Sequence, residues 1–422
     1  MTSQNWRLTM NDNQAKYPQL RFKGFTDPWE ERKLGELATF SKGKGYSKGD
    51  LVPDGHPIIL YGRLYTKYET NIKSVDDTFV VDNADSVKSE LGDVIVPGSG
   101  ETAEDISRAS NIEVAGIILG GDLNVVKPSK EMLDSSFLAI TISNGSQQKE
   151  LTRRAQGKSV VHLHNSDLQT VQVRYPSLKE QRKISQTFSS LDNLVAVTQR
   201  KLAKLKELKQ GYLQKLFPRN GSKFPQLRFA GFADAWEDRK LGTIYDFGKG
   251  KGLPLESFIY SSNNPAIAYG HLYTKYSEVI SEVFWSSNDN GVLSKDNDLL
   301  FPGSSTVPNG TAQANAITLN NVKLGGDIII GRPKEGVGVL STFMSYQINS
   351  QRQKLFPIIV GTTITHMYGK DISKLNFFIT DYSEQEKIAS FFKQLDATIT
   401  LHQRKLEKLQ ELKKGYLQKI FC

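Results

Sequence analysis

The sequence repeats itself once, with a period of about 205 residues. The stretches 18–45 and 225–252 share 19 of 28 positions, and 177–217 aligns with 381–421 without a gap, with 22 of 41 positions identical. Repeat units of solenoid proteins are much shorter, roughly 20–50 residues. We therefore infer a duplicated module, in which a globular part is followed by a long helix. Two similar halves predict an internal pseudo-two-fold, which suits two partner subunits or two half-sites on a duplex.

Length and composition place the chain among proteins with two or three domains and sizeable cores, because it has 422 residues and 38% hydrophobic residues. The longest apolar runs are too short to span a bilayer, so no membrane partner is expected. The first residues contain no apolar segment typical of a secretion signal. The only cysteine is Cys422, which excludes an intrachain disulfide framework and a cysteine metal site. We expect a cytoplasmic location.

The stretches 177–217 and 381–421 carry apolar residues every three or four positions, which predicts two long helices with a coiled-coil seam. Ser177 with Glu180, and Asp381 with Glu384, have the spacing of a capping box at the start of each helix. Each helix would reach roughly 60 Å at about 1.5 Å per residue. The predicted seam consists of Ile184, Phe188, Leu191, Val195, Leu202, Leu205, Tyr212, Ile388, Phe392, Leu395, Ile399, Leu406, Leu409 and Tyr416.

Neither helix covers its apolar stripe alone, so we expect the two helices to pack antiparallel with one globular domain at each end. The fold class is α+β, because short β-rich runs separated by Gly, Asp, Asn and Ser clusters alternate with a few helices in each globular part. We also expect the C-terminal helix to abut residues 18–33, which would bring the chain ends together. The predicted organisation is a flexible tail at 1–17, a first globular domain at 18–176, a central helix at 177–217, a linker at 218–224, a second globular domain at 225–380 and a C-terminal helix at 381–422.

The net charge of +9 is concentrated in the helical stretches. Residues 177–217 hold nine basic against three acidic residues, and 381–421 hold eight against six, which together give +8. A basic excess fits a polyanionic partner, although a solvated helix face explains it as well.

Basic and aromatic residues on expected loops are candidate DNA contacts. A solvated surface residue or a buried tyrosine is the alternative interpretation of each, and a structural hydrogen bond is the alternative for His366. The candidates are Lys42, Lys44, Lys48, Arg63, Tyr65, Lys67, Arg153, Arg154, Lys158, Lys249, Lys251, His271, Tyr273, Lys275 and His366.

Several short motifs occur twice in the same order. They are the E-Q-x-K-I helix starts at 180–184 and 384–388, the Leu-Asp pairs, the R-K-L-x-K-L and K-x-G-Y-L-Q-K helix endings, and the W-E-x-R-K-L-G segments at 29–35 and 236–242. On these motifs the chain, from about residue 18 to its end, resembles the specificity subunit of a type I restriction–modification system.

The resemblance implies two target-recognition domains held apart by two helices, which read a bipartite asymmetric site on double-stranded DNA. It also implies assembly with two methyltransferase subunits on the helical region and two restriction–translocase subunits. The cofactors S-adenosylmethionine, ATP and Mg would then belong to the partner subunits, and none to this chain.

Motifs of catalysis are missing from the sequence. Asn264-Pro265 is followed by Ala266, which breaks the amide loop of an adenine methyltransferase, and Gly157-Lys158-Ser159 lacks the upstream glycine of a P-loop. Glu207 with Lys209, and their counterparts in the second half, have nuclease-like spacing but lie in the coiled coil. We therefore predict a non-catalytic DNA-sequence reader and assembly scaffold. The alternatives are a coiled-coil adaptor without a DNA role and, third, a self-sufficient enzyme.

Overall fold

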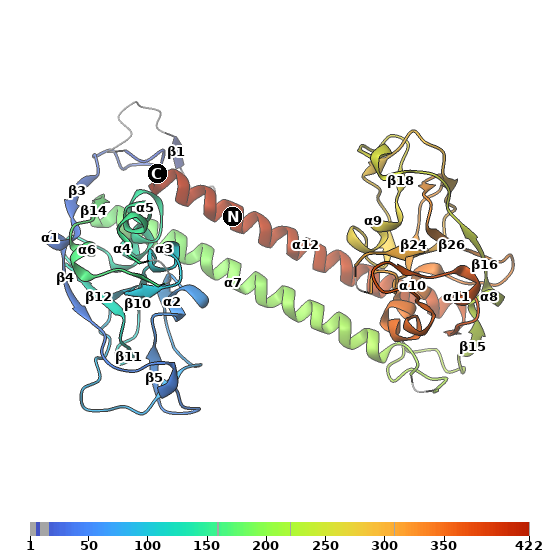
Figure 1. The fold of residues 1–422 in the computed structure, drawn as a ribbon, viewed down its shortest axis with the longest axis horizontal. Coiled ribbons are helices and arrows are strands. Elements are labelled where there is room, and N and C mark those ends of the chain that lie inside the picture. Colours follow the sequence, from blue (N-terminus) through green and yellow to red (C-terminus); the bar gives the residue numbers. More distant parts are fainter. Residues whose placement is uncertain (1–5, 9–16, 158–159, 220, 308, 422) are drawn as a thin grey trace. The chain divides into compact units, whose positions relative to one another are not determined.

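The computed structural model describes residues 6–8, 17–157, 160–219, 221–307 and 309–421 (Figure 1). They divide into two compact units. Unit 1 comprises Met1–Gln199 with Arg404–Cys422, and unit 2 comprises Arg200–Gln403. Both long helices cross the boundary between the units: α7 is Leu178–Lys215 and α12 is Tyr382–Phe421. Each unit therefore contains the first part of one long helix and the last part of the other.

A five-stranded sheet forms the centre of unit 1, in the order β4-β12-β8-β10-β6. Pairing is antiparallel except between β10 and β6, which are parallel. Both faces of the sheet are covered, because Val94 and Val96 contribute to one hydrophobic core while Ile95 contributes to another. The strands of the sheet are β4 (Ala38–Lys42), β12 (Leu123–Pro128), β8 (Val94–Pro97), β10 (Ser110–Ile112) and β6 (Asn71–Ile72).

The other elements of unit 1 surround this sheet. They are β1 (Trp6–Leu8), β2 (Leu20–Phe22), β3 (Glu30–Lys33), α1 (Leu34–Leu37), η1 (Lys48–Asp50), β5 (His56–Ile59), α2 (Arg63–Thr66), β7 (Phe79–Val80), β9 (Ser99–Gly100), α3 (Ala103–Ile106), β11 (Ile118–Leu119), α4 (Ser135–Ile142), α5 (Gly145–Arg154), β13 (Val161–His162), α6 (Asn165–Gln169) and β14 (Gln172–Tyr175).

Unit 2 repeats this topology, because its central sheet has the order β16-β26-β22-β24-β19 with the same pattern of parallel and antiparallel pairing. Its elements are β15 (Glu237–Lys240), α8 (Leu241–Ile244), β16 (Tyr245–Lys249), η2 (Leu255–Ser257), β17 (Ile259–Tyr260), β18 (Ala266–Ile267), α9 (Tyr269–Thr274), β19 (Val279–Ile280), β20 (Trp285–Ser286), β21 (Val292–Leu293), β22 (Asp298–Pro302), β23 (Ser304–Ser305), β24 (Asn315–Ile317), β25 (Lys323–Leu324), β26 (Ile328–Pro333), α10 (Ser341–Ser350), η3 (Arg352–Lys354), η4 (Phe356–Ile358), β27 (Thr365–His366), α11 (Gly369–Ile372) and β28 (Asn376–Ile379).

An aromatic cluster joins the end of a long helix to each unit. In unit 1 the ring of Trp29 lies 5.9 Å from that of Phe137 and 6.3 Å from that of Phe421, near the end of α12. In unit 2 the ring of Trp236 lies 6.3 Å from that of Phe217, which is the second residue after the end of α7. Edge-on aromatic pairs of this kind contribute about 0.5–1.5 kcal/mol beyond their buried area. The predicted contact between the C-terminal helix and residues 18–33 is therefore confirmed.

The start of each long helix is bound to the P-Q-L-R-F segment of its own half. Both carboxylate oxygens of Glu180 accept hydrogen bonds from Arg21, at 2.8 and 2.7 Å, and Glu384 accepts from Arg228 at 2.7 and 2.8 Å. The glutamates of the two predicted capping boxes therefore bind arginines from distant segments, while Asp381 of the second box accepts a hydrogen bond from the backbone amide of Ser383 at 2.9 Å. The adjacent Gln181 also binds the start of α7 to the rest of unit 1, because its side-chain amide donates hydrogen bonds to the carbonyl oxygens of residues 132 and 176.

Within each unit the two long helices run antiparallel. In unit 1 Lys413 of α12 pairs with Asp192 of α7, and Phe421 lies 6.3 Å from Phe188. In unit 2 Lys209 of α7 pairs with Asp396 of α12 at 2.6 Å. The lysines of the nuclease-like spacing are thus partners of the repeated Leu-Asp pairs. All fourteen residues of the predicted seam are buried or half-buried.

The predicted tail at 1–17 lies largely outside the described residues. Its residues 6–8 instead form strand β1, which pairs antiparallel with β2 in the register Trp6 to Phe22. Among the described residues, none of the helices is both long and apolar enough to cross a bilayer.

Candidate nucleic-acid interface

The K-G-K-G loop at 42–45 begins at the last residue of β4, carries two of the candidate lysines and is fixed by backbone packing. A Cβ atom on Gly43 would lie 2.0 Å from the carbonyl oxygen of Gly120, so only glycine fits there. The amide of Lys44 donates to Leu119 O at 3.0 Å, and Gly121 N donates to Gly45 O. Packing therefore requires Gly43, and a positive φ of 62° favours glycine at position 45, while the side chains of Lys42 and Lys44 are exposed.

The corresponding loop of unit 2 is built in the same way. A Cβ atom on Gly250 would meet the carbonyl oxygen of Gly325 at 2.0 Å, and the amide of Lys251 donates to Leu324 O at 3.2 Å. Lys249 and Lys251 are exposed. The L-G-G-D segments at 119–122 and 324–327, which match between the halves, thus support the matched K-G-K-G loops at 42–45 and 249–252.

A third matched segment, P-G-S at 97–99 and 302–304, contacts the same supporting loop. In unit 1 Gly98 N donates to Asp122 O at 2.6 Å, and in unit 2 Gly303 N donates to Asp327 O at 2.6 Å. Both aspartates adopt positive φ, at 58° and 59°. The repeated segments, although far apart in sequence, therefore converge at one end of each central sheet.

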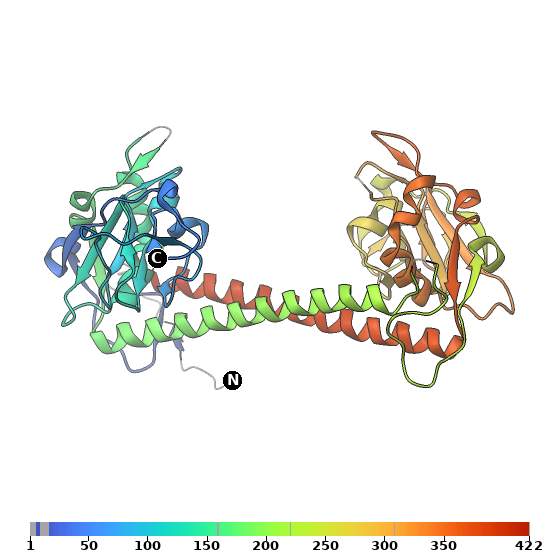
Figure 2. The ribbon, with the colours of Figure 1, turned by 90° about the horizontal axis from the view of Figure 1, so that it is seen from below.

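The two matched histidines lie on strands that pair with this P-G-S segment. His162 of β13 lies opposite Ser99, and its Nδ1 is 2.9 Å from Ser99 Oγ. His366 of β27 lies opposite Ser304 and is half-buried. Each strand belongs to a short hairpin that rises from the body of its own unit (Figure 2).

The lysines of these loops form at most weak ion pairs. Lys44 lies 3.3 Å from Asp85, and Lys249 lies 2.7 Å from Asp327, with all four side chains substantially exposed. The hydrogen bond from Lys249 lowers the pKa of Asp327. Exposed pairs of this kind contribute little, so either lysine can exchange its carboxylate for a phosphate. In the described part of the chain no ion pair involves Lys42, Lys48 or Lys251.

Two candidates belong to the interior, which corrects their assignment as DNA contacts. The guanidinium of Arg63 is 7% exposed and pairs with Asp77 and with Glu69 at 3.3 Å. His271 is 8% exposed and stacks on Trp285 with ring centroids 5.2 Å apart. A buried charge with two carboxylate partners and a buried imidazole are structural groups.

The remaining candidates are spread over several elements. Tyr65 and Tyr273 are half-buried, and burial raises the pKa of Tyr65. Lys67 pairs with Asp77 at 2.6 Å, and Arg154 pairs with Glu150 at 2.6 Å. The other three comprise Lys275 and Arg153, which are exposed, and Lys158, which lies outside the described residues.

Unit 2 exposes an aromatic cluster that the sequence analysis did not select. Tyr260 of β17 is 74% exposed and stacks on Phe284 with centroids 6.2 Å apart, while Trp285 of β20 meets Tyr260 edge-on at 5.7 Å. Beside β7, unit 1 exposes Leu51 and Val81. The signal was the run Val283-Phe284-Trp285 within a stretch where the halves diverge.

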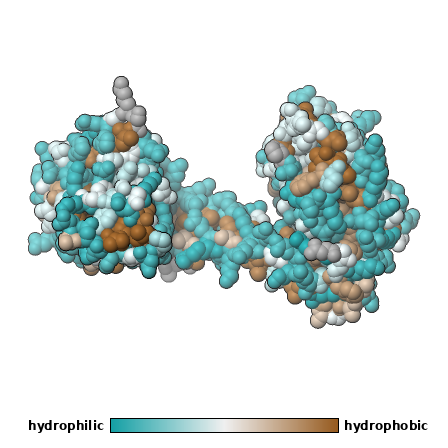
Figure 3. Space-filling view, turned by 60° about the horizontal axis from the view of Figure 1, so that its bottom comes forward, coloured by the Kyte–Doolittle hydropathy of each residue, from teal (hydrophilic) through white to brown (hydrophobic). Residues whose placement is uncertain are grey.

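Exposed apolar clusters of this kind mark interaction surfaces. Figure 3 shows hydrophobic side chains gathered in patches on the face of each unit that it presents. Metal chemistry has no comparable support, since the described residues contain no group of three or more potential metal-ligating side chains.

Comparison with known proteins agrees with this architecture. The family described as "Type I restriction modification DNA specificity domain" matches twice, at residues 26–207 and 233–411. The specificity subunit of the type I restriction enzyme MjaVIII of Methanocaldococcus jannaschii is 20% identical over 92% of this chain and 91% of its own length. A putative MjaX specificity subunit of the same organism is 21% identical over the same shares of the two chains.

A solved structure shares the fold. The crystal structure of the type I restriction–modification S subunit from M. genitalium superposes with a TM-score of 0.63 at 15% identity, covering 96% of this chain and 99% of that one. The two family matches span most of the sequence and correspond to the two halves of the duplication. The chain therefore belongs to the specificity subunits of type I restriction–modification systems.

Proposed function

We propose that this chain reads a bipartite, asymmetric site on double-stranded DNA, one half-site through each unit, and carries no catalytic activity of its own. The observation that carries the proposal is the K-G-K-G loop, which both units hold rigidly at the same end of the central sheet with exposed lysines. Rigid loops with lysines suit phosphate contacts, which position a protein on DNA without reading its sequence.

Sequence reading would come from surfaces on which the two units differ. One such difference is that unit 2 exposes the aromatic residues Tyr260 and Phe284, whereas unit 1 exposes the aliphatic residues Leu51 and Val81. Different surfaces on a common scaffold support two different half-sites and hence an asymmetric target.

Assembly with two methyltransferase subunits is part of the proposal and has its own support. Outside the seam, Val197 and Leu208 of α7 are 54% and 44% exposed, and their counterparts on α12, Leu401 and Leu412, are 65% and 41% exposed. Matched apolar residues on both helices would offer two equivalent docking faces. Two restriction–translocase subunits would complete the complex, with S-adenosylmethionine, ATP and Mg bound by the partner subunits.

The K-G-K-G loop of unit 1 tests the DNA role. The double variant Lys42→Gln, Lys44→Gln, assembled with the cognate methyltransferase subunit, should bind target DNA about tenfold more weakly, and log K should depend less steeply on log salt by about 1–2. Gel shift over a salt series measures both quantities.

The matched control is Lys130→Gln, because Lys130 follows β12 and thus lies at the opposite end of the same sheet. Salt-independent binding by the wild-type complex would favour the adaptor alternative. Methyl transfer by the purified chain alone would contradict the non-catalytic assignment.

A further inference from the structure

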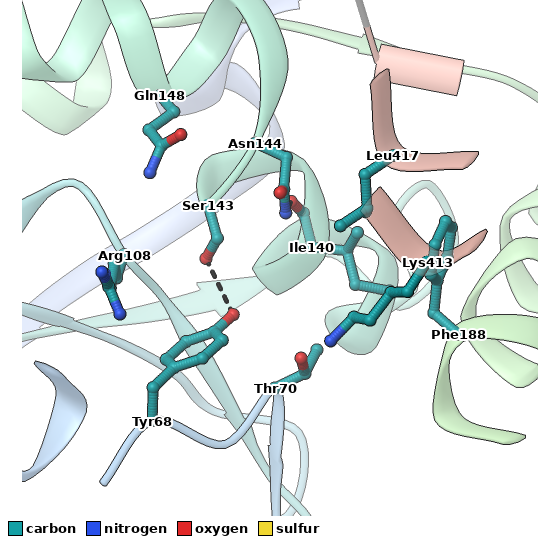
Figure 4. A pocket seen from close by; sticks show the side chains of 10 residues that line it. All are labelled: Tyr68, Thr70, Arg108, Ile140, Ser143, Asn144, Gln148, Phe188, Lys413 and Leu417. Carbon is teal, nitrogen blue, oxygen red and sulfur yellow. Dashed lines mark hydrogen bonds between the residues drawn. The ribbon is translucent and has the colours of Figure 1, made fainter. Parts of the chain in front are cut away.

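Unit 1 contains a pocket of about 270 Å³ beside the two long helices (Figure 4). The hydroxyl of Tyr68 donates to Ser143 Oγ at 3.1 Å, and the guanidinium of Arg108 lies over the Tyr68 ring, 5.6 Å from its centroid. Lys413 of α12 and Ile140 of α4 complete the wall facing the helices. Two cationic groups from different elements therefore border one small space.

The duplication provides an internal comparison for this pocket. Lys209 is the counterpart of Lys413, and Glu278 is the counterpart of Thr70, because each precedes the corresponding edge strand, β19 or β6. The side chain of Ser143 accepts a hydrogen bond from the backbone amide of Ala109 at 2.8 Å, and that of Asn349 accepts one from Ala314 at the same distance. This register makes Tyr346 the counterpart of Ile140, and Gln313 the counterpart of Arg108.

In unit 2 side chains of the chain itself occupy the equivalent space. Lys209 lies 3.0 Å from Glu278 and 2.6 Å from Asp396. The hydroxyl of Tyr346 donates to Asp396 at 2.7 Å, and the Lys209 ammonium lies 5.4 Å from the centre of the Tyr346 ring. One lysine is thus paired with two carboxylates above a phenol ring.

In unit 1 the same position lacks both the second carboxylate and the large ring. Thr70 replaces the glutamate and Ile140 replaces the tyrosine, so among the described residues Lys413 pairs with the Asp192 carboxylate alone. Arg108 adds a cation where unit 2 has a neutral glutamine. The formal charge of this group of side chains is therefore −1 in unit 2, from one lysine and two carboxylates. In unit 1 it is +1, from one lysine, one arginine and one carboxylate.

We propose that the pocket of unit 1 binds a carboxylate, which takes the place that the Glu278 carboxylate has in unit 2. Arg108 and Lys413 would donate charge-assisted hydrogen bonds, and the Ser143 and Tyr68 hydroxyls are within the same lining. The apolar side chains of Phe188, Ile140 and Leu417 lower the local dielectric and strengthen these interactions. The carboxylate belongs either to a small organic acid or to an acidic side chain of a bound protein.

Succinate and its neutral isostere succinamide distinguish charge recognition from nonspecific effects, at constant ionic strength and with the full-length chain. If a small acid is the ligand, succinate raises the melting temperature and succinamide does not. Arg108→Gln, which installs the residue of unit 2, weakens succinate binding at least tenfold in calorimetric titration. Thr70→Glu raises the melting temperature without succinate and abolishes the response to it.

If a protein supplies the carboxylate, Thr70→Glu and Arg108→Gln weaken assembly with the cognate methyltransferase subunit at least tenfold, while Lys130→Gln does not. The assembly experiment rests on the proposed function. If the wild-type chain does not bind the methyltransferase subunit, the proposed function is refuted, and the succinate titration alone tests the carboxylate site. The carboxylate site is refuted if succinate has no effect and neither variant alters assembly.

Discussion

His271 lies in the segment 269–276, which matches 61–68 of the first half at all but one position, and its environment gives it a structural role. Its imidazole lies between two aromatic rings of unit 2, edge-on to Phe258 at 5.2 Å and stacked on Trp285. Its Nδ1 accepts a hydrogen bond from the backbone amide of Ala268 at 3.3 Å. Burial, assisted by the charge of Lys275, lowers the pKa of His271 below 6.5. The neutral imidazole is therefore the form that the fold accommodates.

This residue predicts a pH dependence of stability in unit 2. Because the folded pKa lies below the unfolded value of about 6.5, the unfolded chain binds the proton more strongly. The stability contribution is complete above pH 6.5 and is lost as the pH falls from there towards the folded pKa. His271→Phe should flatten the dependence of the urea midpoint on pH between about 7 and 5, followed by tryptophan fluorescence.

A wild-type midpoint that stays constant over this range would contradict the prediction.

At the scale of elements, each P-Q-L-R-F segment is fastened to the start of the long helix of its own half. The side chains of Arg21 and Glu180 are 5% and 1% exposed, and the Lys183 ammonium lies 4.8 Å from the centre of the Phe22 ring. A cation over an aromatic ring adds about 0.5–2 kcal/mol. The contact joins residues separated by 159 positions, so it holds the first segment of the globular part of unit 1 against the helix that follows that part.

Breaking this pair should destabilise unit 1 strongly. Arg21→Met leaves the Glu180 carboxylate buried without its partner, which costs about 3–5 kcal/mol, and the double variant with Glu180→Met should recover most of the loss. Urea unfolding, read out by hydrogen exchange of the α7 amides, measures both effects. Arg32→Met removes an exposed pair with Glu30 and should change stability by less than about 0.5 kcal/mol. A double variant as unstable as the single one would contradict the argument.

At the scale of the whole molecule, the two units share a scaffold and differ in what they expose. The shared parts are the central sheets, the K-G-K-G loops and the helix junctions, while the exposed apolar residues near β7, β17 and β20 differ. Under the proposed function, such a division would let one unit change its half-site without disturbing the other. The antiparallel pair β3 and β14 marks where the variable part of unit 1 begins and ends.

Exchange of residues 38–170 for the matching segment of a related specificity subunit should therefore rewrite one half-site and leave the other intact. These limits keep β3 and β14 within the retained scaffold, together with the bond from Leu34 N to Val171 O. Mapping of methyladenine in cells that carry the chimera and its methyltransferase measures the outcome. Changes in both half-sites would show that the two units do not read independently.

The sequence alone determined the duplication, the two long helices and the family. Helical periodicity is a local property, so the spacing of Ile184, Phe188 and Leu191 could be interpreted without a partner. The repeated motifs identified the specificity subunits because their order, twice over, is itself a property of the sequence.

Only the tertiary structure decided what individual side chains do. Glu180 has the spacing of a capping residue, yet it binds an arginine 159 positions away. Arg63 and His271 look like surface readers until the chain folds over them, and Tyr260 meets Phe284 only through the pairing of β17 with β20. The roles of these residues depend on contacts between distant segments, which local patterns of residue type cannot encode, because the same side chain is a ligand, a cap or a core residue according to what folds against it.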